Sequence, residues 1–270
     1  MAVIATILVV FGNAAGIAAG PNVVTVSWAA IVQSAGTLLI VIVASRWCGL
    51  TWAEAGIGRT NLLRSSLIGA GIGIGLAAVV LLALELGAQL GSPITYQPLR
   101  GASIGAVLTH ALVGLPLQTA IPEELAFRGL VLGLLMRKLT PLRGASISGV
   151  LTHALVGLPL QTAIPEELAF RGLVLGLLMR KLTALRATLV TSAIFVAWHV
   201  LVQAQTLAVT NFTSPWQIVP AMGLAFAGLF AGGVIFALLR LRTRNLAGAV
   251  VAHWLFDAGL ITGLFFLTRS

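Results

Sequence analysis

Residues 66–91 read SLIGAGIGIGLAAVVLLALELGAQLG, and this stretch decides the class of fold. Its single charged side chain is Glu85. A helix that crosses the hydrocarbon core of a bilayer needs roughly 20 mostly apolar residues. The stretch is therefore predicted to be a transmembrane helix. Its glycines between Gly69 and Gly75 predict close packing against another helix, because small residues let two backbones approach.

The composition of the whole chain supports a membrane protein. Of 270 residues, 59% are hydrophobic and 9% are charged, with a mean hydropathy of +1.05 and a net charge of +9. Soluble domains are about 45–50% apolar and about 25% charged. These values argue against a soluble enzyme, a disordered tail and a nucleic-acid-binding module. Further membrane spans are predicted at about 2–20, 24–45, 187–206, 217–239 and 246–267.

The basic residues predict the topology. Arg46, Arg59 and Arg64 lie between two predicted spans, and we expect a short helix at the membrane interface near 46–65. The positive-inside rule puts this segment and the loop at Arg240–Arg244 on the cytoplasmic side. The first span has no basic residue ahead of it, so we expect no cleavable signal peptide. The predicted fold is an all-α polytopic bundle with about seven or eight transmembrane helices.

A tandem repeat of 43 residues occupies 98–140 and 141–183. The copies differ only at Gly105 against Ser148 and at Ala106 against Gly149. Repeat arrays need at least about three units, so we interpret this pair as a duplication inside one bundle. If each copy crossed the membrane once, the following spans would reverse direction. One copy must therefore re-enter the membrane, lie at the interface or cross twice.

Acidic residues are rare, and four of the seven form two Glu-Glu pairs in the repeat. The seven are Glu54, Glu85, Glu123, Glu124, Glu166, Glu167 and Asp257. A charged residue at the centre of a membrane helix costs about 2.5–3.5 kcal/mol on insertion scales. Adjacent carboxylates in an apolar helix therefore indicate a function.

The second copy contains the sequence PEELAFR at 165–171. Glu167 and Arg171 have i,i+4 spacing and are predicted to pair on one helix face, whereas Glu166 points elsewhere. One carboxylate would be structural and the other free for chemistry. The alternative is an ordinary helix start, with proline and acids in the first turn. The equivalents in the first copy are Glu123, Glu124 and Arg128.

Histidines occur on the later apolar spans. His199 ends the sequence FVAWH at 195–199, and His253 and Asp257 share a helix face at i,i+4 spacing. A carboxylate beside an imidazole fixes its tautomer, as in catalytic and metal-binding histidines. The alternatives are a hydrogen-bonded core histidine at position 199 and a packing pair at 253 and 257. His110 and His153 have no acidic neighbour at helical spacing and are interpreted as core or interfacial.

The remaining nucleophiles lack an activating context. Cys48 is the single cysteine, which excludes an internal disulfide and a CxxC site. Ser103 lies in a Gly-x-Ser-x-Gly sequence at 101–105, but the nucleophile motif of this form joins a strand to a helix, and this chain is predicted to be helical throughout.

Three motifs in this order are specific together: Glu-Glu-x-x-x-Arg, Phe-x-x-x-His and His-x-x-x-Asp. The chain over about 100–267 resembles the CPBP family of intramembrane proteases, also called the CAAX-protease or Abi family. The resemblance implies a division into N-terminal transmembrane segments at 1–97 and a protease core at 98–270.

The resemblance also implies roles for these residues. Glu166 would be the general base that activates water, and His199 would hold and polarise that water. His253 and Asp257 would stabilise the oxyanion, and Arg171 would anchor Glu167. The short link between 183 and 186 favours the second repeat copy over the first.

Asp257 departs from the family, whose third motif commonly ends in asparagine. An ionised aspartate cannot donate a hydrogen bond to an oxyanion. Asp257 must therefore be protonated, which we favour, or orient His253. The motifs require no cofactor, but two histidines with carboxylates also suit a divalent metal such as zinc.

The resemblance predicts hydrolysis of a peptide bond in a membrane-associated or lipidated protein. Membrane lipid is the other expected partner, and no nucleic acid is expected. We expect a multi-pass protein of the plasma membrane. Two other classes remain open: a transporter or proton-relay protein, which would use the same buried Glu, His and Arg, and an inactive scaffold.

Overall fold

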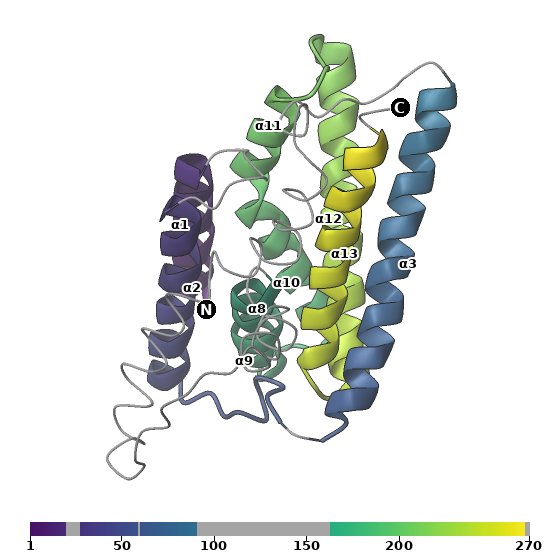
Figure 1. Ribbon diagram of the computed structural model, residues 1–270. Coiled ribbons are helices and arrows are strands. Elements are labelled where there is room, and N and C mark those ends of the chain that lie inside the picture. The colour runs from purple at the N-terminus through teal and green to yellow at the C-terminus, as the bar shows by residue number, and fades with distance from the viewer. Residues whose placement is uncertain (20–27, 59, 91–162, 268–270) are drawn as a thin grey trace, which may run out of the picture.

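The computed structural model describes residues 1–19, 28–58, 60–90 and 163–267. All regular elements in these ranges are helices, as predicted (Figure 1). The first copy of the repeat and the first half of the second, up to residue 162, lie outside them. The topology predicted for the repeat, and residues His110, Glu123, Glu124, Arg128 and His153, therefore lie outside the described residues.

The N-terminal helices pack as a pair. They are α1 (Ala2–Ala19) and α2 (Trp28–Trp47), and they lie side by side at the left of Figure 1. Both are apolar and lie within the ranges predicted from sequence to within a few residues. Their inner faces contribute Ile4, Leu8 and Val41 to a core that also contains Phe170 and Trp198.

A second pair is formed by α3 (Leu62–Gln89) and α13 (Ala247–Leu267), which run along each other at the right of Figure 1. A Cβ added at Gly69 or Gly73 would overlap the backbone carbonyl of Gly248 or Ala252. The glycine-rich part of the opening stretch is therefore the contact surface with α13, which confirms the predicted close packing.

Between these pairs lies a segment that begins in the second repeat copy and continues beyond it. It consists of α8 (Ala163–Glu167), a π-helix η6 (Leu168–Val174), α9 (Leu175–Met179), α10 (Ala184–Trp198) and α11 (Val200–Ala208). The long helix α12 (Pro215–Thr243) packs mainly along α10. The predicted span 187–206 is not one straight helix, because α10 and α11 meet at an angle of 45° at His199.

Three described helices, α3, α12 and α13, are long and apolar enough to cross a membrane, and the bent α10–α11 pair would make a fourth. The shorter apolar helices α1 and α2 add to these. The protein is an all-α helical membrane protein. The predicted count of seven or eight crossings includes the repeat and remains a prediction.

The short helix predicted near 46–65 is not formed. Between α2 and α3 the described residues form turns, with Gly49 and Gly56 at positive φ. Arg180 binds the carbonyl oxygens of Cys48 and Gly49, and Arg240 binds that of Glu54. These arginine side chains donate hydrogen bonds to backbone carbonyls of the segment. The carbonyls are therefore satisfied without helical hydrogen bonds. The loops predicted to be cytoplasmic thus meet at one end of the bundle.

Candidate active site

The two glutamates of the second repeat copy lie at the end of α8, directly before the π-helix. Glu167 and Arg171 are completely buried, and Glu166 is mostly buried. A π-helical segment inside an α-helix is rare and is frequently found at functional sites. Here it continues the helix while Arg171 turns back toward Glu167.

Arg171 is held between a carboxylate and two aromatic rings. Its Nη1 donates to Glu167 Oε1 at 2.6 Å, the i,i+4 pair predicted from the spacing. Its guanidinium lies 4.2 Å from the centroid of Phe195 and 5.4 Å from that of Phe236. Ring faces attract cations, most strongly where water is excluded. The buried charge is therefore compensated by both a counter-ion and π-systems.

Glu167 also orients His253, which lies on α13. Glu167 Oε1 is 3.0 Å from His253 Nδ1. A carboxylate paired with a guanidinium accepts hydrogen bonds, so Nδ1 carries the proton and donates. Phe236 stacks on the imidazole at 5.3 Å with an interplanar angle of 28°. Together these contacts fix the ring and direct Nε2 away from Glu167.

His199 is fixed in a similar way at the bend between α10 and α11. Its Nδ1 is 2.9 Å from the carbonyl oxygen of Phe195, one turn earlier. A carbonyl oxygen only accepts, so Nδ1 is the protonated nitrogen. In the neutral ring Nε2 is then an acceptor. The Phe-x-x-x-His spacing in the sequence thus corresponds to a bond that sets the tautomer.

Glu166 lies between the two imidazoles. Its Oε2 is 3.6 Å from His199 Nε2 and 4.0 Å from His253 Nε2. Asp257 Oδ2 lies 3.5 Å from His253 Nε2. Glu166 Oε2 is buried and has no hydrogen-bond partner among the described residues. Residues from three separate helical segments therefore converge on one small polar volume, and the free carboxylate oxygen faces into it.

The role of Asp257 differs from one alternative drawn from the sequence. Glu167, not Asp257, holds the protonated nitrogen of His253. Asp257 lies at the other ring nitrogen. This leaves Asp257 beside the reactive edge of the imidazole.

The histidines and carboxylates of the site are also possible metal ligands. Among the described residues, no group of three or more His, Cys, Asp or Glu side chains is placed to hold a metal ion. The Nδ1 atoms are already engaged, by Phe195 O and by Glu167. The remaining donors around Glu166 Oε2 are 3.6 and 4.0 Å from it.

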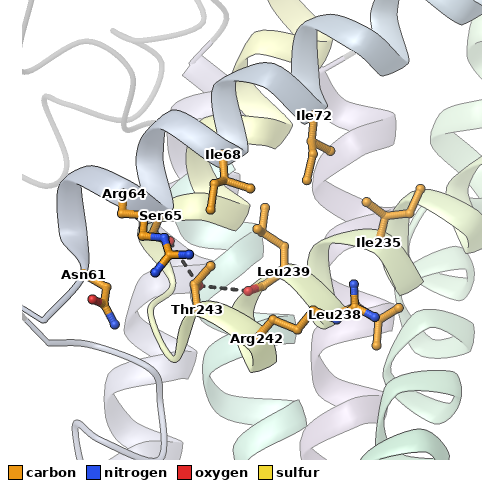
Figure 2. Close-up of a pocket in the computed structure, with 10 residues that line it drawn as sticks. All are labelled: Asn61, Arg64, Ser65, Ile68, Ile72, Ile235, Leu238, Leu239, Arg242 and Thr243. Carbon is orange, nitrogen blue, oxygen red and sulfur yellow. Dashed lines mark hydrogen bonds between the residues drawn. The ribbon is translucent and has the colours of Figure 1, made fainter.

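A separate cavity of about 380 Å³ lies between α3 and α12 (Figure 2). Ile68, Ile72 and Ile235 contribute to its apolar wall, and Arg64 and Arg242 also line it. Ser65, Thr243 and the Leu239 carbonyl form a hydrogen-bonded row at one side. None of the residues predicted to be catalytic lines this cavity, so its size does not identify it as the reaction site.

Two groups near the site were not selected from the sequence. Phe236 contacts both Arg171 and His253. The sequence predicted the apolar helix that carries Phe236, but gave no signal for the residue itself. Asn13 bonds to the backbone on both sides of His199. A single asparagine in an otherwise apolar predicted span was the available signal.

Comparison with known families agrees with this geometry. Residues 151–259 match the model of the family described as type II CAAX prenyl endopeptidase Rce1-like. The matched range contains Glu166, Glu167, Arg171, His199, His253 and Asp257. No curated protein and no solved structure matches the chain.

The helical membrane fold and the matched domain define an intramembrane endopeptidase of the CAAX type, a hydrolase integral to the membrane. Residues 151–259 therefore match a domain of the CAAX protease family.

Proposed function

We propose that the protein hydrolyses a peptide bond near the C-terminus of a prenylated, membrane-associated protein, with water activated by Glu166 and His199. The family match supports the substrate class. The observation that carries the mechanism is the convergence of Glu166, His199 and His253. The plasma membrane is the proposed location, and membrane lipid is the surrounding partner.

The geometry supports one position for the attacking water. Glu166 Oε2 and the acceptor nitrogen of His199 are 3.6 Å apart. Two acceptors cannot bond to each other, but one water can donate a hydrogen to each. Its lone pair is then free to attack the scissile carbonyl carbon. As the carbon–oxygen bond forms, Glu166 takes the proton as general base.

The second step follows from the same groups. The tetrahedral oxyanion would accept a hydrogen bond from His253 Nε2 in the imidazolium form, which the carboxylate of Glu167 at Nδ1 favours electrostatically. Asp257 in its protonated form would donate a second hydrogen bond. Collapse of the intermediate breaks the carbon–nitrogen bond, and Glu166 returns its proton to the leaving amine. Atoms and protons balance without a further reactant.

Two observations support the second repeat copy as the catalytic one. The matched domain begins at residue 151, inside the second copy. Only residues 180–183 separate α9 from α10, and Thr183 caps α10 by accepting from the Arg186 amide. The short connection keeps the Glu166 helix next to the His199 helix.

We propose a mechanism that requires no bound metal. Zinc is the alternative that two histidines and carboxylates would permit. Elemental analysis of the purified active protein should find substoichiometric zinc, and chelation should leave hydrolysis unchanged. Stoichiometric zinc that disappears with activity in Glu166→Gln would contradict the proposal.

The central test uses the purified full chain in liposomes with a farnesylated peptide that ends in a CAAX sequence. Glu166→Gln should lower the rate at least about 10²-fold, because general bases contribute roughly 10²–10⁴-fold. Glu123→Gln changes the equivalent residue of the other copy and should retain most activity. Glu85→Gln serves as a second control. The Glu85 carboxylate lies on α3, away from the site, and accepts a hydrogen bond from Gln89.

The opposite pattern, with Glu123→Gln inactive and Glu166→Gln active, would assign the site to the first copy. Equal activity of all three variants would contradict a Glu166-dependent protease. Proton flux in liposomes without peptide cleavage would favour the relay alternative.

A further inference from the structure

The bend at His199 has a local cause on a different helix. In a continuous helix the amide of Leu201 would donate to the carbonyl oxygen of Ala197. Here both groups bond to the side chain of Asn13 on α1. Asn13 Nδ2 donates to Ala197 O at 2.9 Å, and the Leu201 amide donates to Asn13 Oδ1 at 2.8 Å. A carboxamide is thus inserted into the helical hydrogen-bond ladder, which is one of the established causes of sharp kinks.

The orientation of this carboxamide is fully determined by its partners. Asn13 Nδ2 also donates to Val9 O at 2.9 Å, in its own helix. A flipped amide would place its oxygen against two carbonyl oxygens and its NH₂ against the Leu201 amide. Asn13 is only 8% exposed, so water does not substitute for these bonds.

The neighbouring contacts show that α1 is fitted to the bend. A Cβ at Gly12 would overlap the indole of Trp198, and one at Gly16 would overlap Val202. Small residues therefore flank Asn13 and let its short side chain reach the opposite backbone. Trp198, which precedes His199, is itself buried against the ring of Phe170 at 5.5 Å.

The break changes the environment of His199 directly. The His199 amide donates to Val196 O at 2.9 Å, three residues back. The Phe195 carbonyl is thereby available to the His199 ring, which bonds it through Nδ1. His199 has φ −95° and ψ 0°, a sparsely populated backbone region found at many active-site residues. If the Leu201 amide bonded to the Ala197 carbonyl and the helix became continuous, the His199 amide would donate to the Phe195 carbonyl, which now accepts from the His199 ring.

We propose that Asn13 is a positioning residue of the protease: its inserted carboxamide holds open the helix at His199 and so aims Nε2 at the water beside Glu166. This inference rests on the proposed role of His199. Asn13 does not touch the reacting atoms. Its effect should therefore pass entirely through His199.

The decisive variant is Asn13→Leu, which has similar volume and allows the Leu201–Ala197 hydrogen bond to form. The kcat for the farnesylated peptide should fall about 10–100-fold with KM changed less than about threefold, because displacement by about 1 Å can cost about 10²-fold. Asn13→Gln retains the carboxamide and should recover part of the loss. Gln205→Leu removes another bond between the same helices, Gln205 Nε2 to Ile17 O at 3.2 Å, and should retain activity.

A double-mutant cycle separates positioning from general destabilisation. In a His199→Gln background, Asn13→Leu should cause no further loss of rate, whereas an independent structural effect would multiply the two losses. NMR of ¹⁵N-histidine-labelled protein should show the Nδ1-protonated tautomer of His199 in the parent and a mixture in Asn13→Leu.

The outcomes distinguish the two proposals. Full activity of His199→Gln would overturn the proposed role of His199 and, with it, this inference. An inactive His199→Gln together with a fully active Asn13→Leu would overturn the inference alone. Equal losses in Asn13→Leu and Gln205→Leu, or multiplicative losses in the cycle, would reduce Asn13 to a packing residue.

Discussion

Two glutamate–arginine pairs of the described chain lie in opposite surroundings. Glu167 and Arg171 are one helical turn apart and entirely buried, joined through a single bond of 2.6 Å. Glu54 and Arg180 are far apart in sequence, and about a third of each side chain is exposed. Arg180 donates two hydrogen bonds to the Glu54 carboxylate, of 2.8 and 2.9 Å. The better hydrogen-bonded pair is the one at the surface.

The difference shows that the buried pair is not built for maximal stability. Arg171 Nε and Nη2 and Glu167 Oε2 are buried without a hydrogen-bond partner among the described residues. Desolvation of two ions can exceed their mutual attraction, so a buried pair is weak evidence for stability. The buried pair instead orients the catalytic imidazole, because Glu167 accepts a hydrogen bond from His253 Nδ1. The exposed pair makes no contact with the site. The exposed pair instead fastens the turns at 48–57 to the end of α9.

The largest expected effect comes from removing one partner of the buried pair. Arg171→Met leaves Glu167 buried without its counter-ion and should lower the free energy of unfolding by about 3–5 kcal/mol. Hydrolysis should be lost as well. Thermal unfolding in detergent, with the peptide assay, measures both effects.

Replacing both partners sharpens the comparison. The double variant Glu167→Leu, Arg171→Met should recover most of the lost stability, since apolar substitutes for a buried pair are often neutral or stabilising. It should remain inactive, because His253 Nδ1 has lost its acceptor. Recovery of activity in this variant would show that the pair is only structural.

A smaller effect is expected at Asp257, the carboxylate at the edge of the buried cluster. In the neutral-donor account, Asp257→Asn keeps a hydrogen-bond donor at every pH. Activity should hold or rise, most clearly at high pH, where an aspartate increasingly ionises and ceases to donate. A pH–rate profile of both proteins, with metal analysis, provides the test. A large loss at every pH would rule out the neutral donor, and loss of metal together with activity would indicate a ligand.

The smallest effect is expected at the exposed pair, and it depends on pH. The hydrogen bonds from Arg180 and then from Thr51 lower the pKa of Glu54 from 4.5 to about 2. The unfolded chain therefore takes up a proton first as the pH falls. The stabilisation is complete above about 4.5 and is lost as the pH approaches about 2. Glu54→Gln should lower the melting temperature slightly at pH 7, without loss of activity, and the difference from the parent should vanish near pH 2. An unchanged difference at pH 2 would contradict this assignment.

The class of fold could be predicted because it depends on local composition. A run of apolar residues long enough for a bilayer predicts a helix whatever surrounds it, as in α3. The Glu167–Arg171 pair could be predicted for the same reason, since it lies within one turn. These features depend on neighbours in the chain.

The features missed from the sequence depend on distant partners. The bend at His199 requires Asn13 from α1, and the turns at 48–57 require Arg180 and Arg240. The bond from His253 to Glu167 joins α13 to α8, and the i,i+4 spacing of His253 and Asp257 gave no indication of it. Spacing identifies residues on one helix face, but not which face of another helix they meet.

The glycine contact between α3 and α13 has a consequence for the accuracy of catalysis. A side-chain atom lies about 5–6 Å from its helix axis, so a rotation of α13 by about 20° would carry His253 Nε2 through about 2 Å. Backbone packed directly on backbone at Gly69 and Gly73 leaves no compressible side chain between the two helices. The rotation of α13 about its own axis is therefore fixed by α3, a helix that contributes no residue to the chemistry. Substitutions on α3 should reduce activity most where the helix contacts α13, and their effect should not depend on distance from the catalytic residues.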